Sequence, residues 1–239
     1  MALVSVDELM GRAFHIPSYQ RGYRWTEVEV KALLDDLWEF AQRRPDNNEF
    51  YCLQPIVLQE NPETGTTDLL DGQQRLTTLY LILSFLEQKR QEDNYNKPLF
   101  SLSYATRRCS QDYLQQGRFQ ADGAETRNNV DYYHFAKAYK CIKDWFTVSP
   151  AHRGAQTKLL PILLDESGAG ANVRLIEYKL EDDSKPIEVF LRLNQGKIPL
   201  TDAELVKALL LQADQYAQDG LPLIQPQLDL IASEWYEIE

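Results

Sequence analysis

The alternation of apolar and polar positions along the chain predicts a mixture of amphipathic helices and short strands. Apolar residues at three- and four-residue spacing predict helices over 30–41, 76–86 and 132–146. A shorter helix is expected over 106–114. Runs of apolar and β-branched residues predict strands, with an extended segment over 14–19 and strands at 52–59, 66–70, 99–104, 159–164 and 173–180. Both element types occur throughout, so we expect an α+β fold.

Capping boxes mark where several helices begin. The pattern Ser/Thr-x-x-Glu occurs at Ser5–Glu8, Thr26–Glu29 and Thr201–Glu204, each flanked by apolar residues. A further helix is expected over 185–193. We therefore predict an α+β body over 1–183 and a helical extension over 184–239. The final residues have the pattern of an amphipathic helix, so we expect the protein to continue into a further C-terminal domain.

Composition narrows the classes of function. The formal net charge is −11 over 239 residues, so any contact with nucleic acid would need a local basic patch, such as Arg21 with Arg24 or Arg107 with Arg108. The three cysteines and three histidines lack metal-binding spacing, and a reduced cytoplasmic setting is expected. No apolar run is long enough to span a membrane, so no membrane partner is expected.

One polar cluster, Asp71-Gly72-Gln73-Gln74-Arg75, stands between a predicted strand and a predicted helix. A helix N-terminus presents free N–H groups and partial positive charge, which suits phosphate. The carboxylate of Asp71 would repel phosphate unless Mg²⁺ bridges the two, or unless Asp71 faces the ribose or base while Arg75 holds the phosphates. The simpler alternative is that Asp71 is an N-cap and Gln74 completes a capping box.

A second polar cluster, Ile16–Trp25, follows an extended segment that contains Pro17. A guanidinium held rigidly there, that of Arg21, would offer a bidentate fork to phosphate. The alternative is an exposed salt bridge, which contributes little to stability. Tyr19, Gln20 and Tyr23 surround this arginine; the tyrosines are either packing residues or partners for a base.

A third polar cluster, Phe190–Gly196, contains Arg192 and Asn194, which would close over a bound nucleotide. Its alternative role is a helix C-cap, because Asn and Gly tolerate the left-handed conformation. No Gly-x-x-x-x-Gly-Lys-Ser/Thr loop is present, which excludes a P-loop NTPase. Three separated polar clusters on one chain suggest a single site assembled from distant segments.

Together, the three polar clusters resemble the N-terminal domain of GmrSD-type, modification-dependent restriction endonucleases, within the ParB/sulfiredoxin-like superfamily. The matching segments are Ile16–Trp25, Asp71–Leu79 and Phe190–Leu200, with Thr201–Leu210 continuing the pattern. The resemblance spans nearly the whole chain. It implies a small mixed sheet surrounded by helices, with a helical C-terminal part.

The resemblance also implies a function. Similar proteins are nucleotide-hydrolysing regulators of anti-phage defence that act on foreign or modified DNA, with GTP or another NTP as substrate. Carried over, the Asp-Gly-Gln-Gln-Arg motif makes Asp71, Gln73, Gln74 and Arg75 catalytic, with Asp71 holding Mg²⁺ or another divalent cation. Nucleotide binding would fall to a larger set: Tyr19, Gln20, Arg21, Gly72, Arg75, Arg192 and Asn194.

The resemblance further implies that DNA is cleaved by a separate C-terminal nuclease domain of the His-Asn-His type, in cis or in trans. This domain would contact DNA through the complete protein, and a homodimer is possible. Two alternatives stay open at this point. The domain is a nucleotide switch or a sensor of modified DNA without turnover, or it is itself a ParB-like metal-dependent nuclease. The sequence offers no second acid clustered with Asp71, which disfavours the nuclease.

Overall fold

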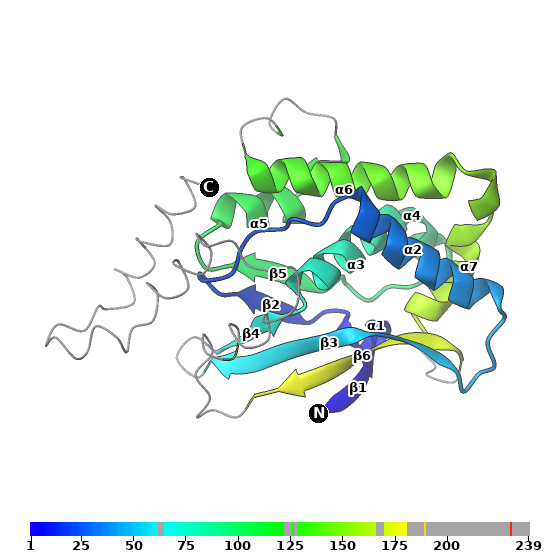
Figure 1. The fold of residues 1–239 in the computed structure, drawn as a ribbon, viewed down its shortest axis with the longest axis horizontal. Coiled ribbons are helices and arrows are strands. Elements are labelled where there is room, and N and C mark those ends of the chain that lie inside the picture. The colour runs from blue at the N-terminus through cyan, green and yellow to red at the C-terminus, as the bar shows by residue number, and fades with distance from the viewer. Residues whose placement is uncertain are drawn as a thin grey trace, which may run out of the picture.

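The computed structural model describes residues 1–61, 65–121, 126, 129–165, 170–180, 189 and 230. Within these residues a mixed sheet of six strands carries helices on one side, as Figure 1 shows. The strand order is β1-β6-β3-β4-β2-β5, formed by Ala2–Ser5, Asn172–Lys179, Phe50–Asn61, Thr66–Asp71, Ala13–Ile16 and Ser101–Tyr104. The α+β fold expected from the sequence is confirmed.

The sheet contains both parallel and antiparallel pairs. β3 and β4, which correspond to the strands predicted at 52–59 and 66–70, form an antiparallel hairpin, and β1 pairs antiparallel with β6. The pairs β3–β6, β2–β4 and β2–β5 are parallel. β1 was not predicted, because its few residues carry no clear alternation of apolar and polar positions. The sheet places the end of β4 in its interior, next to both β3 and β2.

The principal helices lie over one face of the sheet (Figure 1). They are α2 (Glu27–Gln42), α3 (Gln73–Phe85), α6 (Val130–Thr147) and α7 (Ala155–Leu163). Shorter helices are α1 (Val6–Leu9), α4 (Glu87–Glu92) and α5 (Arg108–Gln115), with 3₁₀ turns at Arg118–Gln120 and Pro150–His152. α3 packs against α6, and α6 against α2, so that their apolar faces share one core.

The capping boxes at the first two predicted helix starts are confirmed. Ser5 and Glu8 cap each other at α1, and Thr26 and Glu29 do so at α2. The third capping box, at Thr201, lies outside the described residues. The predicted boundary at residue 183 and the helical extension over 184–239 also fall outside them, apart from isolated positions 189 and 230.

The strand predicted over 159–164 is wrong, because this segment belongs to helix α7. A short apolar run has no periodicity that separates a strand from a buried helix. Here Gly154 supplies a left-handed N-cap, and α7 packs on α2 and β6. Four of the apolar residues that the helix takes from this run are buried: Leu159, Leu160, Ile162 and Leu163. Pro161 lies within this helix.

No helix in the described part of the chain is long and apolar enough to cross a membrane. None of the three cysteines forms a disulfide; Cys141 is buried, whereas Cys52 and Cys109 are exposed.

Candidate functional site

The first two polar clusters meet through the side chain of Gln74, in the first turn of α3. Its Oε1 accepts hydrogen bonds from the main-chain N–H groups of Arg24, at 2.8 Å, and Trp25, at 3.2 Å. Its Nε2 donates to the main-chain oxygen of Gly22, at 3.0 Å. One carboxamide therefore holds three of the four residues of Gly22–Trp25, a segment that has no regular secondary structure. These bonds bring the first two of the three polar clusters into contact, and whether they form one functional site stays a prediction.

Further contacts fasten the upstream cluster to the sheet and to α3. Gln20 is buried and its Nε2 donates to the main-chain oxygen of Leu69, on β4. The hydroxyls of Tyr23 and Thr78 lie 2.9 Å apart. Tyr19 is buried as well, and burial raises the pKa of its hydroxyl, with Asp68 adding to the effect. Tyr19 and Gln20 therefore lie inside the protein, whereas Arg21 between Gln20 and Gly22 is only half-buried.

Asp71 does not cap the helix, so the prediction of an N-cap completed by Gln74 is wrong. Asp71 is the last residue of β4 and pairs with Val57 of β3. The N-cap is Gly72, with φ +100°, and it makes no side-chain hydrogen bond to the helix. A Cβ added to Gly72 would lie 2.6 Å from Cγ2 of Ile56. Glycine is required there by both conformation and space, and the first turn of α3 begins without a side-chain cap.

The guanidinium of Arg75 hydrogen-bonds to an irregular part of β3. It donates to Oε1 of Gln54 at 2.7 Å and to the main-chain oxygen of Pro55, and it lies 3.7 Å from the carboxylate of Asp71. The register of β3 against β6 shifts between Leu53 and Ile56, because proline cannot donate to the ladder. Burial lowers the pKa of Arg75, and the charge of Asp71 acts in the opposite direction.

Gln73 points into the protein rather than toward solvent. It is 5% exposed, and its Nε2 has no hydrogen-bond partner in the described part of the chain. The hydroxyls of Thr77 and Tyr104 are likewise buried without a hydrogen-bond partner in the described part of the chain. Burial raises the pKa of the Tyr104 hydroxyl, and the charge of Asp131 adds to the effect.

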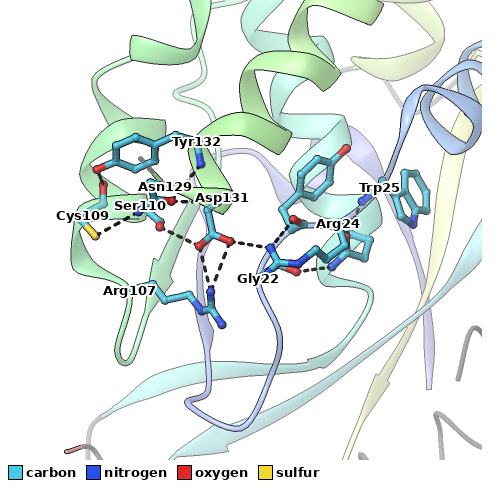
Figure 2. A network of polar contacts seen from close by, with 11 residues as sticks. Gly22, Arg24, Trp25, Arg107, Cys109, Ser110, Asn129, Asp131 and Tyr132 are labelled. Carbon is cyan, nitrogen blue, oxygen red and sulfur yellow. Dashed lines mark hydrogen bonds and ion pairs between the residues drawn. The ribbon is translucent and has the colours of Figure 1, made fainter. Parts of the chain in front are cut away.

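A buried carboxylate forms the second centre of the site, and the sequence analysis did not identify it. Asp131, in the first turn of α6, is fully buried. Figure 2 shows it between Arg24 on one side and Arg107 on the other. The carboxylate accepts from Nη1 of Arg24 at 2.9 Å, from Nη1 of Arg107 at 3.2 Å and from Oγ of Ser110 at 2.8 Å.

This arrangement corrects one expectation. Arg107 was a candidate for an exposed basic patch, but its side chain is 2% exposed and paired with Asp131. A buried arginine cannot form a surface patch for nucleic acid. The signal that the sequence offered was weak: Asp131 directly follows an Asn-Val pair at a predicted helix start, where acidic residues are common for reasons of helix stability alone.

The fit of Mg²⁺ to Asp71 depends on a bound nucleotide. Mg²⁺ is usually held by one or two carboxylates together with phosphate oxygens and waters. The carboxylate of Asp71 is partly exposed at the end of β4, so it can contribute one ligand. No cluster of three or more His, Cys, Asp or Glu side chains suited to a metal occurs among the described residues. Asp71 therefore fits a metal shared with phosphates rather than a metal held by the protein alone.

The third polar cluster cannot be placed in this geometry. Arg192 and Asn194, predicted to close over a nucleotide, lie outside the described residues. The site as described thus combines the end of β4, the segment 19–25, and the starts of α3, α5 and α6. Four side chains that build it were not among the predicted site residues: Arg24, Arg107, Ser110 and Asp131.

Comparison with known proteins agrees with the motifs that form this site. A search of curated proteins finds no match. A family model described as the N-terminal domain of GmrSD restriction endonucleases matches residues 6–211, which include all three polar clusters. The chain therefore belongs to the GmrSD restriction endonuclease N-terminal domain family.

Proposed function

We propose that this domain binds and hydrolyses a nucleoside triphosphate, with GTP as the first candidate, and so licenses DNA cleavage in a restriction endonuclease. The observation that carries the proposal is the joining of the two motif segments by Gln74, at the uncapped N-terminus of α3. A helix N-terminus without a side-chain cap offers its N–H groups to an anion. The family membership supplies the setting of a restriction system.

The residues divide into those that would touch the nucleotide and those that position others. Arg21, half-buried on the held segment, would contact phosphate oxygens. Asp71 would hold Mg²⁺ or orient water. Gln73 is buried, but its Nε2 has no hydrogen-bond partner in the described part of the chain, so it stays a candidate for positioning the attacking water. Bound Mg²⁺ would neutralise part of the negative charge of the phosphates. Gln74 and Arg75 make several bonds within the protein, so we assign both to positioning.

The partners follow from the same proposal. A C-terminal nuclease domain of the His-Asn-His type, in cis or in trans, would carry out cleavage, and the complete protein would contact DNA. Arg192 and Asn194 stay candidates for closing the nucleotide pocket. A cytoplasmic location and a homodimer also stay predictions.

The test is isothermal titration of the chain with GTP, ATP and CTP, with and without Mg²⁺, followed by measurement of phosphate release. We expect micromolar binding of one nucleotide, which is about −8 kcal/mol at 1 μM. Arg21→Gln should weaken it strongly. Lys31→Gln provides the control, because Lys31 is an exposed cation on α2 that pairs with Glu27 one turn earlier in the helix. Failure of all three nucleotides to bind would refute the proposal.

A second candidate function is a nucleotide switch without turnover. It is favoured by the engagement of Gln74, whose amide makes three hydrogen bonds to main-chain atoms and is thereby held away from a role in orienting water. Both candidates predict nucleotide binding. They differ in steady-state phosphate release, which the switch would lack, and in the effect of Asp71→Asn, which would reduce turnover only in the hydrolase.

A further inference from the structure

The segment Gly22–Trp25 is held from two opposite directions. From α3, Gln74 binds its main-chain atoms, as described above. From α6, the carboxylate of Asp131 binds the side chain of Arg24 at 2.9 Å. Arg24 is therefore fixed both at its main-chain nitrogen and at its guanidinium. Figure 2 shows this second anchor on the side of the segment that faces α6.

The close approach of Gly22 shows how tightly the segment lies against Asp131. A Cβ added to Gly22 would overlap the carboxylate of Asp131 and would lie 2.9 Å from Nη1 of Arg107. Only a residue without a side chain fits between these charged groups. The main chain at Gly22 thus sets the distance between the upstream segment and the buried carboxylate.

Asp131 is itself fixed by its position in the helix. The side chain of Asn129 caps α6 by accepting hydrogen bonds from the main-chain N–H groups of Asp131, at 2.9 Å, and Tyr132, at 3.2 Å. A carboxylate in the first turn of a helix is stabilised by the helix dipole. Ser110, from α5, donates a further hydrogen bond to the same carboxylate at 2.8 Å.

Arg107 joins the same carboxylate from another part of the chain. It lies directly before α5, and its Nη1 is 3.2 Å from Oδ2 of Asp131. Two guanidiniums, from positions 24 and 107, are therefore oriented by one buried acid. A guanidinium presents five N–H donors in a rigid plane, so a single carboxylate fixes the direction of the donors that it does not itself use.

We propose that Asp131 is a positioning residue of the nucleotide site, which acts through Arg24 and the segment that carries Arg21 rather than by touching the ligand. Arg107 is buried and holds the acid in place. Through its ion pair with Arg24, the acid keeps this segment in the conformation that Gln74 also fixes. A buried carboxylate in direct contact with phosphate would repel it, so the role is exerted through Arg24 and its segment. This inference rests on the proposed function.

The first measurement identifies the ligand. The unaltered chain is titrated with GTP, ATP and CTP in the presence of Mg²⁺, and the tightest binder is then titrated into Asp131→Asn. We expect roughly a tenfold or greater loss of affinity, because contacting residues couple strongly. The unfolding midpoint of each variant is measured in the same buffer, so that only folded protein is compared.

Trp145→Phe provides the control. It removes the hydrogen bond to Asp35 near the opposite end of α6 and leaves the partners of Asp131 unaltered, so we expect lower stability with affinity within roughly twofold. If Asp131→Asn does not fold, Asp131→Glu keeps the charge while displacing the carboxylate, and we expect it to lose affinity relative to the same control.

A double-variant cycle separates positioning from a general loss of structure. If Asp131 acts through Arg24, the effect of Asp131→Asn on affinity should shrink in an Arg24→Gln background. Additive losses in the two variants would overturn the inference, as would unchanged affinity in a folded Asp131→Asn protein. Absence of nucleotide binding by the unaltered chain would overturn the proposed function as well, which distinguishes the two failures.

Discussion

Oε1 of Gln74 lies 2.8 Å from the main-chain nitrogen of Arg24, although 50 positions separate the two residues in the sequence. This contact makes one residue of the Asp-Gly-Gln-Gln-Arg motif responsible for the shape of the upstream segment. The motif is therefore a structural junction as well as a candidate nucleotide site. Its residues point in different directions, and each direction leads to a separate prediction.

Gln74→Ala should destabilise the protein by about 2–4 kcal/mol, because three hydrogen bonds are lost and two main-chain N–H groups lose their acceptor. Denaturant unfolding measures the change. Gln88→Ala is the matched control, since Gln88 is exposed and its side-chain amide donates a hydrogen bond to Glu92, one turn later in the same helix. We expect the control to change stability by less than about 0.5 kcal/mol. Equal effects of the two changes would contradict the role assigned to Gln74.

Gly72→Ala should be more destabilising than an alanine substitution at another left-handed glycine. Gly72 has φ +100°, and an added Cβ would lie 2.6 Å from Ile56. Gly154 has φ +78° with nothing within 4 Å of its added Cβ. Gly154→Ala should lower the free energy of unfolding by about 1 kcal/mol from conformation alone. Gly72→Ala should lower it further, because the added Cβ also overlaps the side chain of Ile56 on β3. Similar thermal shifts for both variants would show that Ile56 simply moves aside.

Arg75→Ala should lower the free energy of unfolding by about 1–3 kcal/mol, because it removes charged hydrogen bonds to Gln54 and Pro55. Arg153→Ala, at an exposed position after a 3₁₀ turn, is the control. Urea unfolding of both variants provides the comparison. If the unfolding curve of Arg75→Ala matched that of the unaltered protein, the hydrogen bonds from Arg75 to β3 would make no net contribution to stability. Any nucleotide titration of this variant needs its stability measured at the same temperature.

His134→Gln should flatten the dependence of stability on pH in the acidic range. Burial lowers the pKa of His134 from 6.5, and the positive charges of Arg24 and Lys137 add to the effect, while Asp131 opposes it. The unfolded chain therefore binds the proton more readily than the folded protein does. The contribution of neutral His134 is present above about pH 6.5 and is lost as the pH falls through the folded pKa. Thermal unfolding from about pH 7.5 to pH 5 checks this expectation. Parallel curves for the variant and the unaltered protein would contradict it.

The sequence alone was enough to determine most local structure. Helical spacing of apolar residues located α2, α3 and α6, and side-chain capping fixed the starts of α1 and α2. These signals are reliable because they depend on residues within a few positions of one another. The strand prediction at 159–164 was wrong, because residues within a few positions do not decide how so short an apolar run folds. Packing against α2 and β6 decides it.

The tertiary structure decided how the site is assembled. The sequence determined that Asp71–Arg75 would follow a strand and open a helix, and motif resemblance linked this cluster to Ile16–Trp25. Only the fold showed that Gln74 is the link, that Arg75 turns toward β3, and that Asp131 joins Arg24 to Arg107. Such contacts connect side chains across long stretches of chain. Their partners are chosen by strand order and helix packing, which no local pattern of residues specifies.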